Sequence, residues 1–331
     1  MIWPAEGAWR MLFVVTSDSL WDALLLRDGV RTLPVTIASG SVGRLSAQLF
    51  GQRSSRADRA LRLCSFAVAL WLTLTVSPVV RYARAAEALA PIITHLLALG
   101  MVCMVLVRDE RAPQLLRDWL PLCFLPFLYL EARWPIAGIG RPHSDSIVQA
   151  WEALVFPSDP SGTLAVRLPG VALSEALHAA YLSYYGLLYL PPLVLYLRKS
   201  RAAFAETMLA LAVAFGVCFT TFLLFPVDGP RFENGAALAP NGPVRTLTLA
   251  LLQGASTRGT AFPSSHVAAS VVVTICALRF VKPMGYLLVA LTAALMAATV
   301  YGGFHYAVDV VAGLLVGMLA VLLAHFIWVR L

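Results

Sequence analysis

The stretch FPSSHVAASVVVTICALRF, residues 262–280, places a Pro, two Ser and a His where a polar segment becomes a long apolar run. A second boundary of the same kind lies in YGGFHYAVDVVAG, residues 301–313. A membrane helix has little reason to begin with a titratable side chain, because ionisable groups in such segments are costly and usually functional. His266 and His305 are therefore the first candidates for a functional site.

Composition places the chain in a membrane. Of its 331 residues 59% are hydrophobic and only 13% charged, whereas a typical soluble domain is about a quarter charged. The apolar residues come in long runs, so we expect an all-α polytopic membrane protein. The net charge of +7 comes largely from Arg residues in short loops, which membrane topology explains better than nucleic-acid binding. We expect no nucleic-acid partner, and we interpret the five Cys as small buried residues.

The apolar runs predict about eight spans, because a spanning helix needs about 20 apolar residues. They are 62–80, 90–107, 116–131, 176–197, 202–225, 263–281, 284–302 and 306–328. The third is short and contains Pro121 and Pro126. We divide the chain into a cytoplasmic or membrane-surface segment (1–60), two accessory transmembrane helices (61–115) and a six-helix catalytic core (116–331).

Basic residues orient these spans. They gather in 53–62, 108–117, 198–201 and 279–282 and at position 330, all on one side of the predicted topology. Cytoplasmic loops carry such an excess of Lys and Arg. Both termini are then cytoplasmic, and the loops 132–175 and 226–262 lie outside. His266 and His305 fall at the outer face, which we expect to be the extracytoplasmic face of a bacterial inner membrane.

The segment HYAVD supplies a nucleophile or base. His305 and Asp309 are four residues apart, so on a helix they share a face and can touch. A carboxylate beside an imidazole fixes its tautomer and leaves the other ring nitrogen aimed outward. The alternative is a buried His–Asp pair that only holds two helices together.

The segment FPSSH supplies an anion cradle. Pro263 suits a first helical turn, and Ser264 and Ser265 offer hydroxyl and N–H groups where the helix dipole favours an anion. His266 beside that anion could give a proton to a leaving oxygen. A serine cap with an interfacial His is the alternative.

The segment FPVDGPRF, residues 225–232, supplies a cation on the same outer side. The planar fork of Arg231 suits phosphate oxygens, unless Asp228 pairs with it as a structural clamp. Together the three segments predict a phosphoryl-transfer site without metal or cofactor. In it His305 attacks phosphorus, Asp309 orients His305, and His266 protonates the leaving group. Arg231, Ser264 and Ser265 hold the phosphate oxygens.

Further polar side chains lie above or beside this predicted site. Those that could contact a polar headgroup or an acceptor are Asp145, Glu152, Glu175, His178 and Tyr184. The acidic residues and His178 could equally be solvated loop residues and caps. Tyr184, with its neighbours Tyr181 and Tyr185, could equally belong to an interfacial aromatic belt.

At these residues the sequence resembles the type 2 phosphatidic acid phosphatase superfamily. Its members share a Pro-Ser-Gly-His motif, matched by PSSH with Ser265 in place of Gly, and a final motif that ends like HYAVD. The resemblance covers roughly residues 116–328. It implies a six-helix core, a metal-independent phosphotransferase or phosphatase, and membrane lipids as substrate and product.

Three departures narrow the resemblance. In its last motif the family has Ser-Arg where this chain has Ala298 and Thr299. In its first motif the family has a Lys seven positions before an Arg; here the Arg is Arg231 and the position of the Lys is occupied by Leu224. A phosphodiester monoanion needs less positive charge than a monoester dianion, so the substrate carries less charge or cations come from elsewhere. The pattern is similar to the branch of inositol phosphorylceramide and sphingomyelin synthases. It implies transfer of a phospho-headgroup through a phosphohistidine; a lipid phosphate phosphatase and a transporter with a His–Asp proton relay remain the alternatives.

Overall fold

The computed structural model describes residues 55–107, 112–233 and 239–331. Most of the predicted N-terminal segment 1–60 lies outside these residues. Within them the chain is all helical apart from loops and one isolated bridge between Val227 and Thr260. The helices are α3 (Arg56–Ala85), α4 (Ala90–Val107), α5 (Gln114–Cys123), α6 (Leu125–Glu131), α7 (Arg133–Ile139), α8 (Asp145–Val155), α9 (Pro160–Arg167), α10 (Val171–Leu182), α11 (Tyr184–Leu197), α12 (Arg201–Leu224), α13 (Pro230–Glu233), α14 (Pro243–Ala255), α15 (Ser265–Phe280), α16 (Lys282–Tyr301) and α17 (Ala307–Trp328).

The predicted spans all became helices, and the fold class is confirmed. In the described part of the chain five helices are long and apolar enough to cross a membrane: α3, α4, α12, α16 and α17. The number rises to seven if each of two bent segments is counted as one span. In the first, α5 and α6 meet α7 at a bend of 46°; in the second, α10 meets α11 at a bend of 40°. The predicted span 263–281 is α15, whose 16 residues rise only about 24 Å.

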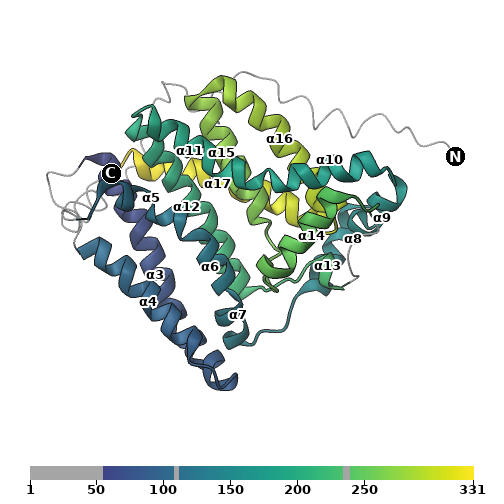
Figure 1. Cartoon of the computed structure of the whole chain (residues 1–331), viewed down its shortest axis with the longest axis horizontal. Helices are drawn as coiled ribbons and strands as arrows, with labels where there is room; N and C mark the ends of the chain where they lie inside the picture. Colours follow the sequence, from purple (N-terminus) through teal and green to yellow (C-terminus); the bar gives the residue numbers. More distant parts are fainter. Residues whose placement is uncertain (1–54, 108–111, 234–238) are drawn as a thin grey trace.

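The accessory helices α3 and α4 pack beside one another at one side of the bundle (Figure 1). Helix α3 touches α7 so closely that a Cβ at Gly138 would lie 1.8 Å from the Pro78 carbonyl oxygen. His95 of α4 bonds the buried Glu131 of α6 and the Leu72 carbonyl. The close contact at Gly138 and the buried hydrogen bonds of His95 therefore hold α3 and α4 against the core.

Both long loops that the sequence predicts on the outer side contain helices of their own. Helices α8 and α9 lie in 132–175, and α13 and α14 lie in 226–262. They gather at the end of the bundle where α17 begins, with α8 against α17 and α14 against α10 (Figure 1). The loops thus form a helical cap over the ends of the spans.

The cysteines depart from the expectation in part. All five are free, and Cys64, Cys218 and Cys276 are buried as expected. Cys103 and Cys123 are instead exposed on the surface of the bundle. Both stand on apolar helix surfaces, where a membrane lipid replaces the protein core as the apolar neighbour.

Candidate active site

Close packing between α15 and α17 sets the frame of the site. A Cβ at Gly313 would lie 2.5 Å from the Ser264 carbonyl oxygen, and one at Gly317 would lie 2.7 Å from that of Ala268. Two small residues four apart let membrane helices approach this closely. The Ser264 N–H also donates to the Asp309 carbonyl at 3.0 Å. The N-termini of α15 and α17 therefore meet at one level.

His305 lies in the short loop before α17, backed by Asp309. Its Nδ1 is 3.4 Å from Asp309 Oδ2, and both side chains are almost fully buried. Oδ2 also accepts the Tyr306 backbone N–H at 2.9 Å, which fixes the carboxylate. Burial lowers the pKa of His305 to about 4, and the nearby Ala261 carbonyl opposes part of this effect. The imidazole is therefore neutral near pH 7, which is the form that can act as a base or a nucleophile.

His266, in the first turn of α15, faces His305 across the site. The ring centroids are 5.8 Å apart, with 64° between the ring planes. Its Nε2 lies 3.4 Å from the Tyr181 hydroxyl, and the Tyr184 ring centroid lies 4.4 Å from its own. Its Nδ1 is buried without a hydrogen-bond partner. Two histidines from separate segments thus meet, and the Nδ1 of each is buried without a hydrogen-bond partner among the described residues.

A polar pocket of about 380 Å³ joins both histidines to Arg231. Arg231 lies over the Phe232 ring, 4.8 Å from its centroid, and donates to the Leu252 carbonyl at 3.4 Å. Asp228 does not clamp it: that carboxylate binds Arg258 Nε and Nη2 at 2.8 and 2.5 Å. Arg231 therefore lines the pocket without an ion-pair partner among the described residues, and its guanidinium can bind an anion there.

Neither serine lines the polar pocket, and Ser264 takes the capping position that the sequence left open as the alternative. Ser264 is the N-cap of α15, where its hydroxyl accepts the Val267 N–H at 3.4 Å. It is fully buried, and its own N–H is used by Asp309. Ser265 lines an apolar chamber behind His266 instead of the polar pocket. The structure therefore brings Arg231 and the histidines together, but leaves the serines outside their pocket.

Three of the five predicted headgroup contacts, all of them carboxylates, have structural partners. Glu152 accepts the N–H groups of Ala307 and Val308, both at 2.9 Å, so it caps α17. Asp145 accepts those of Asp228 and Gly229 at 2.9 and 2.8 Å. Glu152 and Asp145 thereby hold the cap against the segments that carry the site. Glu175 accepts the N–H groups of Val244 and Arg245 at 2.7 and 3.0 Å, so it caps α14.

The remaining two differ from one another. His178 is buried on α10, where its Nδ1 lies 2.6 Å from the Ser174 carbonyl and its ring packs on Phe304. It does not line the polar pocket. Tyr184 is also buried, and it packs on His266 and lines the apolar chamber. Tyr184 thus lies beside the site, whereas its neighbour Tyr185 is exposed at the surface.

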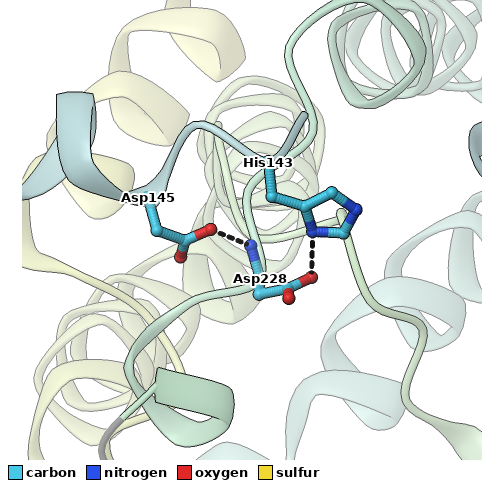
Figure 2. Close-up of side chains that lie close together, drawn as sticks. All are labelled: His143, Asp145 and Asp228. Atoms are coloured by element: carbon cyan, nitrogen blue, oxygen red, sulfur yellow. Dashed lines mark hydrogen bonds and ion pairs between the residues drawn. The ribbon is translucent and has the colours of Figure 1, made fainter. Parts of the chain in front are cut away.

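One cluster has the composition of a metal site. His143, Asp145 and Asp228 each offer a ligand atom within 4.8 Å of the others (Figure 2). Asp228 Oδ1, however, already accepts from His143 Nδ1 at 2.7 Å and from the Gly259 N–H at 2.8 Å. Every oxygen of the two carboxylates is thereby engaged by a hydrogen-bond donor. We interpret the cluster as a clamp that joins three segments, because a cation would have to displace these bonds.

Sequence reasoning missed part of the pocket wall. Tyr129 of α6 lines it and bonds the Thr260 hydroxyl at 3.1 Å, and Tyr181 lines it beside His266. Tyr129 stands in an apolar run without any motif, so no local pattern singles it out. The belt interpretation of Tyr181 rested on its place near a helix end, which fits a buried contact equally well.

Comparisons with known proteins agree with this arrangement at the level of the superfamily. A family model described as the PAP2 superfamily matches residues 154–323, just over half of the chain. That range contains Arg231, His266, His305 and Asp309 and leaves the accessory helices outside. No curated protein and no solved structure gave a significant match. The chain therefore belongs to the PAP2 superfamily, whose model spans both histidine segments.

Proposed function

We propose that this protein is an integral membrane lipid phosphotransferase. It moves a phospho-headgroup from a phospholipid to an alcohol acceptor through a phosphohistidine, in the manner of inositol phosphorylceramide synthases. Membership of the superfamily supports a lipid enzyme of the phosphatase or phosphotransferase type. The observation that carries the finer proposal is the placement of His266 against His305, with Asp309 behind His305.

The first step forms the covalent intermediate. The ring nitrogen of His305 that is turned away from Asp309 attacks phosphorus, a nitrogen–phosphorus bond forms, and the bond to the lipid oxygen breaks. His266 gives its proton to that oxygen, so the lipid leaves as a neutral alcohol. An anionic phosphate in the pocket favours the protonated form of His266 that this step requires. Asp309 stabilises the positive charge that develops on His305.

The second step reverses these roles. His266 takes the proton of the acceptor hydroxyl, the acceptor oxygen attacks phosphorus, and the bond to His305 breaks. His266 is then protonated again and the cycle closes. Arg231 holds the non-reacting oxygens through both steps, since a guanidinium fork matches phosphate geometry.

Charge in the polar pocket supports a phosphodiester as the donor. Among the described residues that line the pocket, Arg231 contributes a positive charge, while the negative charge of Asp228 is matched by Arg258. A diester has one negative charge at phosphorus, which one guanidinium balances. A monoester would bring a second negative charge into a largely buried pocket, and among the described lining residues the protonated His266 of the first step would have to balance it.

The polar ends of the helices support the proposed orientation. Arg201 binds Asp58 at 2.7 Å, and Arg279 binds Glu206 at the same distance. Arg279 stands at the end of α15 opposite to His266. If this basic end is cytoplasmic, as in most membrane proteins, both termini lie in the cytoplasm and the site opens at the extracytoplasmic face of a bacterial inner membrane.

Purified protein in lipid vesicles tests the proposal. It is offered a glycerophospholipid diester with a fluorescent alcohol acceptor, and in parallel a phosphatidic acid monoester. We expect headgroup transfer to the acceptor by the wild type and none by His305→Ala. Turnover of the monoester alone would replace the proposal with a lipid phosphate phosphatase. If neither lipid reacts, both enzymatic readings fail and the transporter alternative takes their place.

A further inference from the structure

An apolar chamber of about 740 Å³ lies directly behind His266. It is bounded by α6, α10, α11, α12 and α14 and by the first turn of α15. Its walls are mostly aromatic and aliphatic side chains; Tyr184, Leu188, Phe215 and Leu252 are among them. The mechanism above does not use this space. A space lined in this way suits the hydrocarbon part of an amphiphile.

The chamber and the polar pocket meet at His266. Four residues line both spaces: Tyr129, Tyr181, Leu252 and His266. His305 and Arg231 line only the polar pocket. The two histidines therefore differ in surroundings, because the proposed nucleophile faces polar space alone while the proposed acid borders the apolar chamber.

This asymmetry orients the substrate. In phosphoryl transfer the attacking and leaving atoms lie roughly in line, on opposite sides of phosphorus. The acid that protonates the leaving oxygen must be within hydrogen-bond reach of it. With His305 on one side, the leaving oxygen lies on the His266 side, where the chamber begins. The group attached to that oxygen then extends into apolar space.

We propose that this chamber holds the hydrocarbon chain of the alcohol that leaves, while the polar remainder of the substrate stays with Arg231. The inference rests on the proposed function and adds to it the position and the length limit of the chain. The substrate is then a phosphate ester of a long-chain alcohol or acylglycerol, and its hydrocarbon chain enters the chamber beside Tyr184.

The far end of the chamber provides the length limit. Leu125, Phe215 and Phe219 line the chamber and also line a second apolar cavity of about 480 Å³. The opposite wall of that cavity is formed by α3, with Val68 and Trp71. Helix α3 lies outside the range that matches the family. The three shared side chains thus form an end wall between the chamber and the second apolar cavity, which α3 borders on its other side.

A chain-length series makes this wall measurable. The probes are methyl n-alkyl phosphates from butyl to dodecyl, used below their micelle concentration so that each chain moves from water into protein. Each methylene that enters the chamber raises kcat/KM about fourfold. The value of kcat/KM stops rising at the chain length that reaches the end wall. The readout is the breakpoint of this series, followed as n-alkanol release.

Phe215→Ala joins the chamber to the cavity beside α3. We expect its breakpoint to move to chains longer by two methylenes or more, with a gain of about fourfold in kcat/KM for each methylene beyond the wild-type limit. Phe204→Ala is the matched control, because Phe204 is equally buried on α12 but packs on Trp119 and Tyr196. Its breakpoint should stay where the wild type has it.

Ala255→Phe tests the same chamber by filling it, and covers the case in which Phe215→Ala does not fold. Ala255 lines the chamber at the end of α14, so the larger side chain should shorten the breakpoint. An unchanged breakpoint in both variants, or an equal shift in Phe204→Ala, overturns the chamber inference. If the wild type releases no alkanol from any ester, it is the proposed function that fails.

Discussion

Gly313 of α17 lies against Ser264 of α15 so closely that a Cβ on the glycine would stand 2.5 Å from the serine carbonyl oxygen. The carbonyl of Asp309, one turn before Gly313, accepts the N–H of the same serine at 3.0 Å. The loop with His305 precedes this turn, and His266 follows Ser264 by two residues. Helix packing therefore sets the spacing between the two imidazoles.

Gly313→Val should reduce activity without touching the pocket. The added side chain cannot fit against the Ser264 backbone, so α15 and α17 must separate or shift, at a cost of roughly 1–3 kcal/mol. Because small displacements at a reacting centre are costly, we expect at least about a hundredfold loss of kcat. Gly100→Val on α4 is the control, since a Cβ there meets no atom within 4 Å. Full activity in Gly313→Val would show that packing does not set the site.

Arg231→Ala should weaken the hold on the phosphoryl group. Arg231 is the lining cation without a carboxylate partner among the described residues, and a charge-assisted hydrogen bond contributes about 1.5–3 kcal/mol. We expect kcat/KM to fall roughly tenfold to a hundredfold, with partial recovery in Arg231→Lys. Steady-state kinetics with the diester donor measure both. A rate equal to that of the wild type would remove Arg231 from the site.

The pH profile should reflect the buried state of His305. Its pKa is lowered to about 4, chiefly by burial. The neutral, nucleophilic form therefore persists as the pH falls below the ordinary histidine value and is lost only near pH 4. We expect the acidic limb of kcat/KM, which reports free-enzyme groups, to lie well below pH 6. A limb between pH 6 and 7 would show that His305 titrates as an exposed histidine.

Activity should persist in the presence of a chelator. The proposed chemistry uses two imidazoles and a guanidinium, and the carboxylates of the His143–Asp145–Asp228 clamp are saturated by hydrogen bonds. Dialysis against EDTA, followed by assay with and without added Mg²⁺, Mn²⁺ or Zn²⁺, checks this. Loss of activity on dialysis and its return with one of these ions would reassign the clamp as a metal centre.

The sequence predicted the helical spans and the meeting of the histidine segments, because both depend on local patterns. Apolar runs marked the spans, and charged loops placed His266 and His305 at one level. The helices inside the outer loops were not predicted, since their length and polarity resemble ordinary loops. Their packing over α17 and α10 depends on tertiary contacts.

Partners of single side chains were less predictable. The sequence left Asp228 as a possible partner of Arg231, which follows it by three residues. Asp228 instead binds Arg258, which follows α14 along the chain. Ser264 has the expected capping position, but its groups face Asp309 and Val267 instead of the pocket. Such choices follow from how loops meet in three dimensions, which residue spacing does not encode.

The central claim is that His305 carries the phosphoryl group during turnover, and trapping the intermediate tests it most directly. Protein quenched during turnover of the diester donor, kept at alkaline pH and digested, is analysed by mass spectrometry. We predict that the peptide containing His305 carries the added mass of the phospho-headgroup, and that His305→Ala carries none and loses at least about a thousandfold in kcat. Appreciable turnover by His305→Ala, or the label on another residue, would contradict the account.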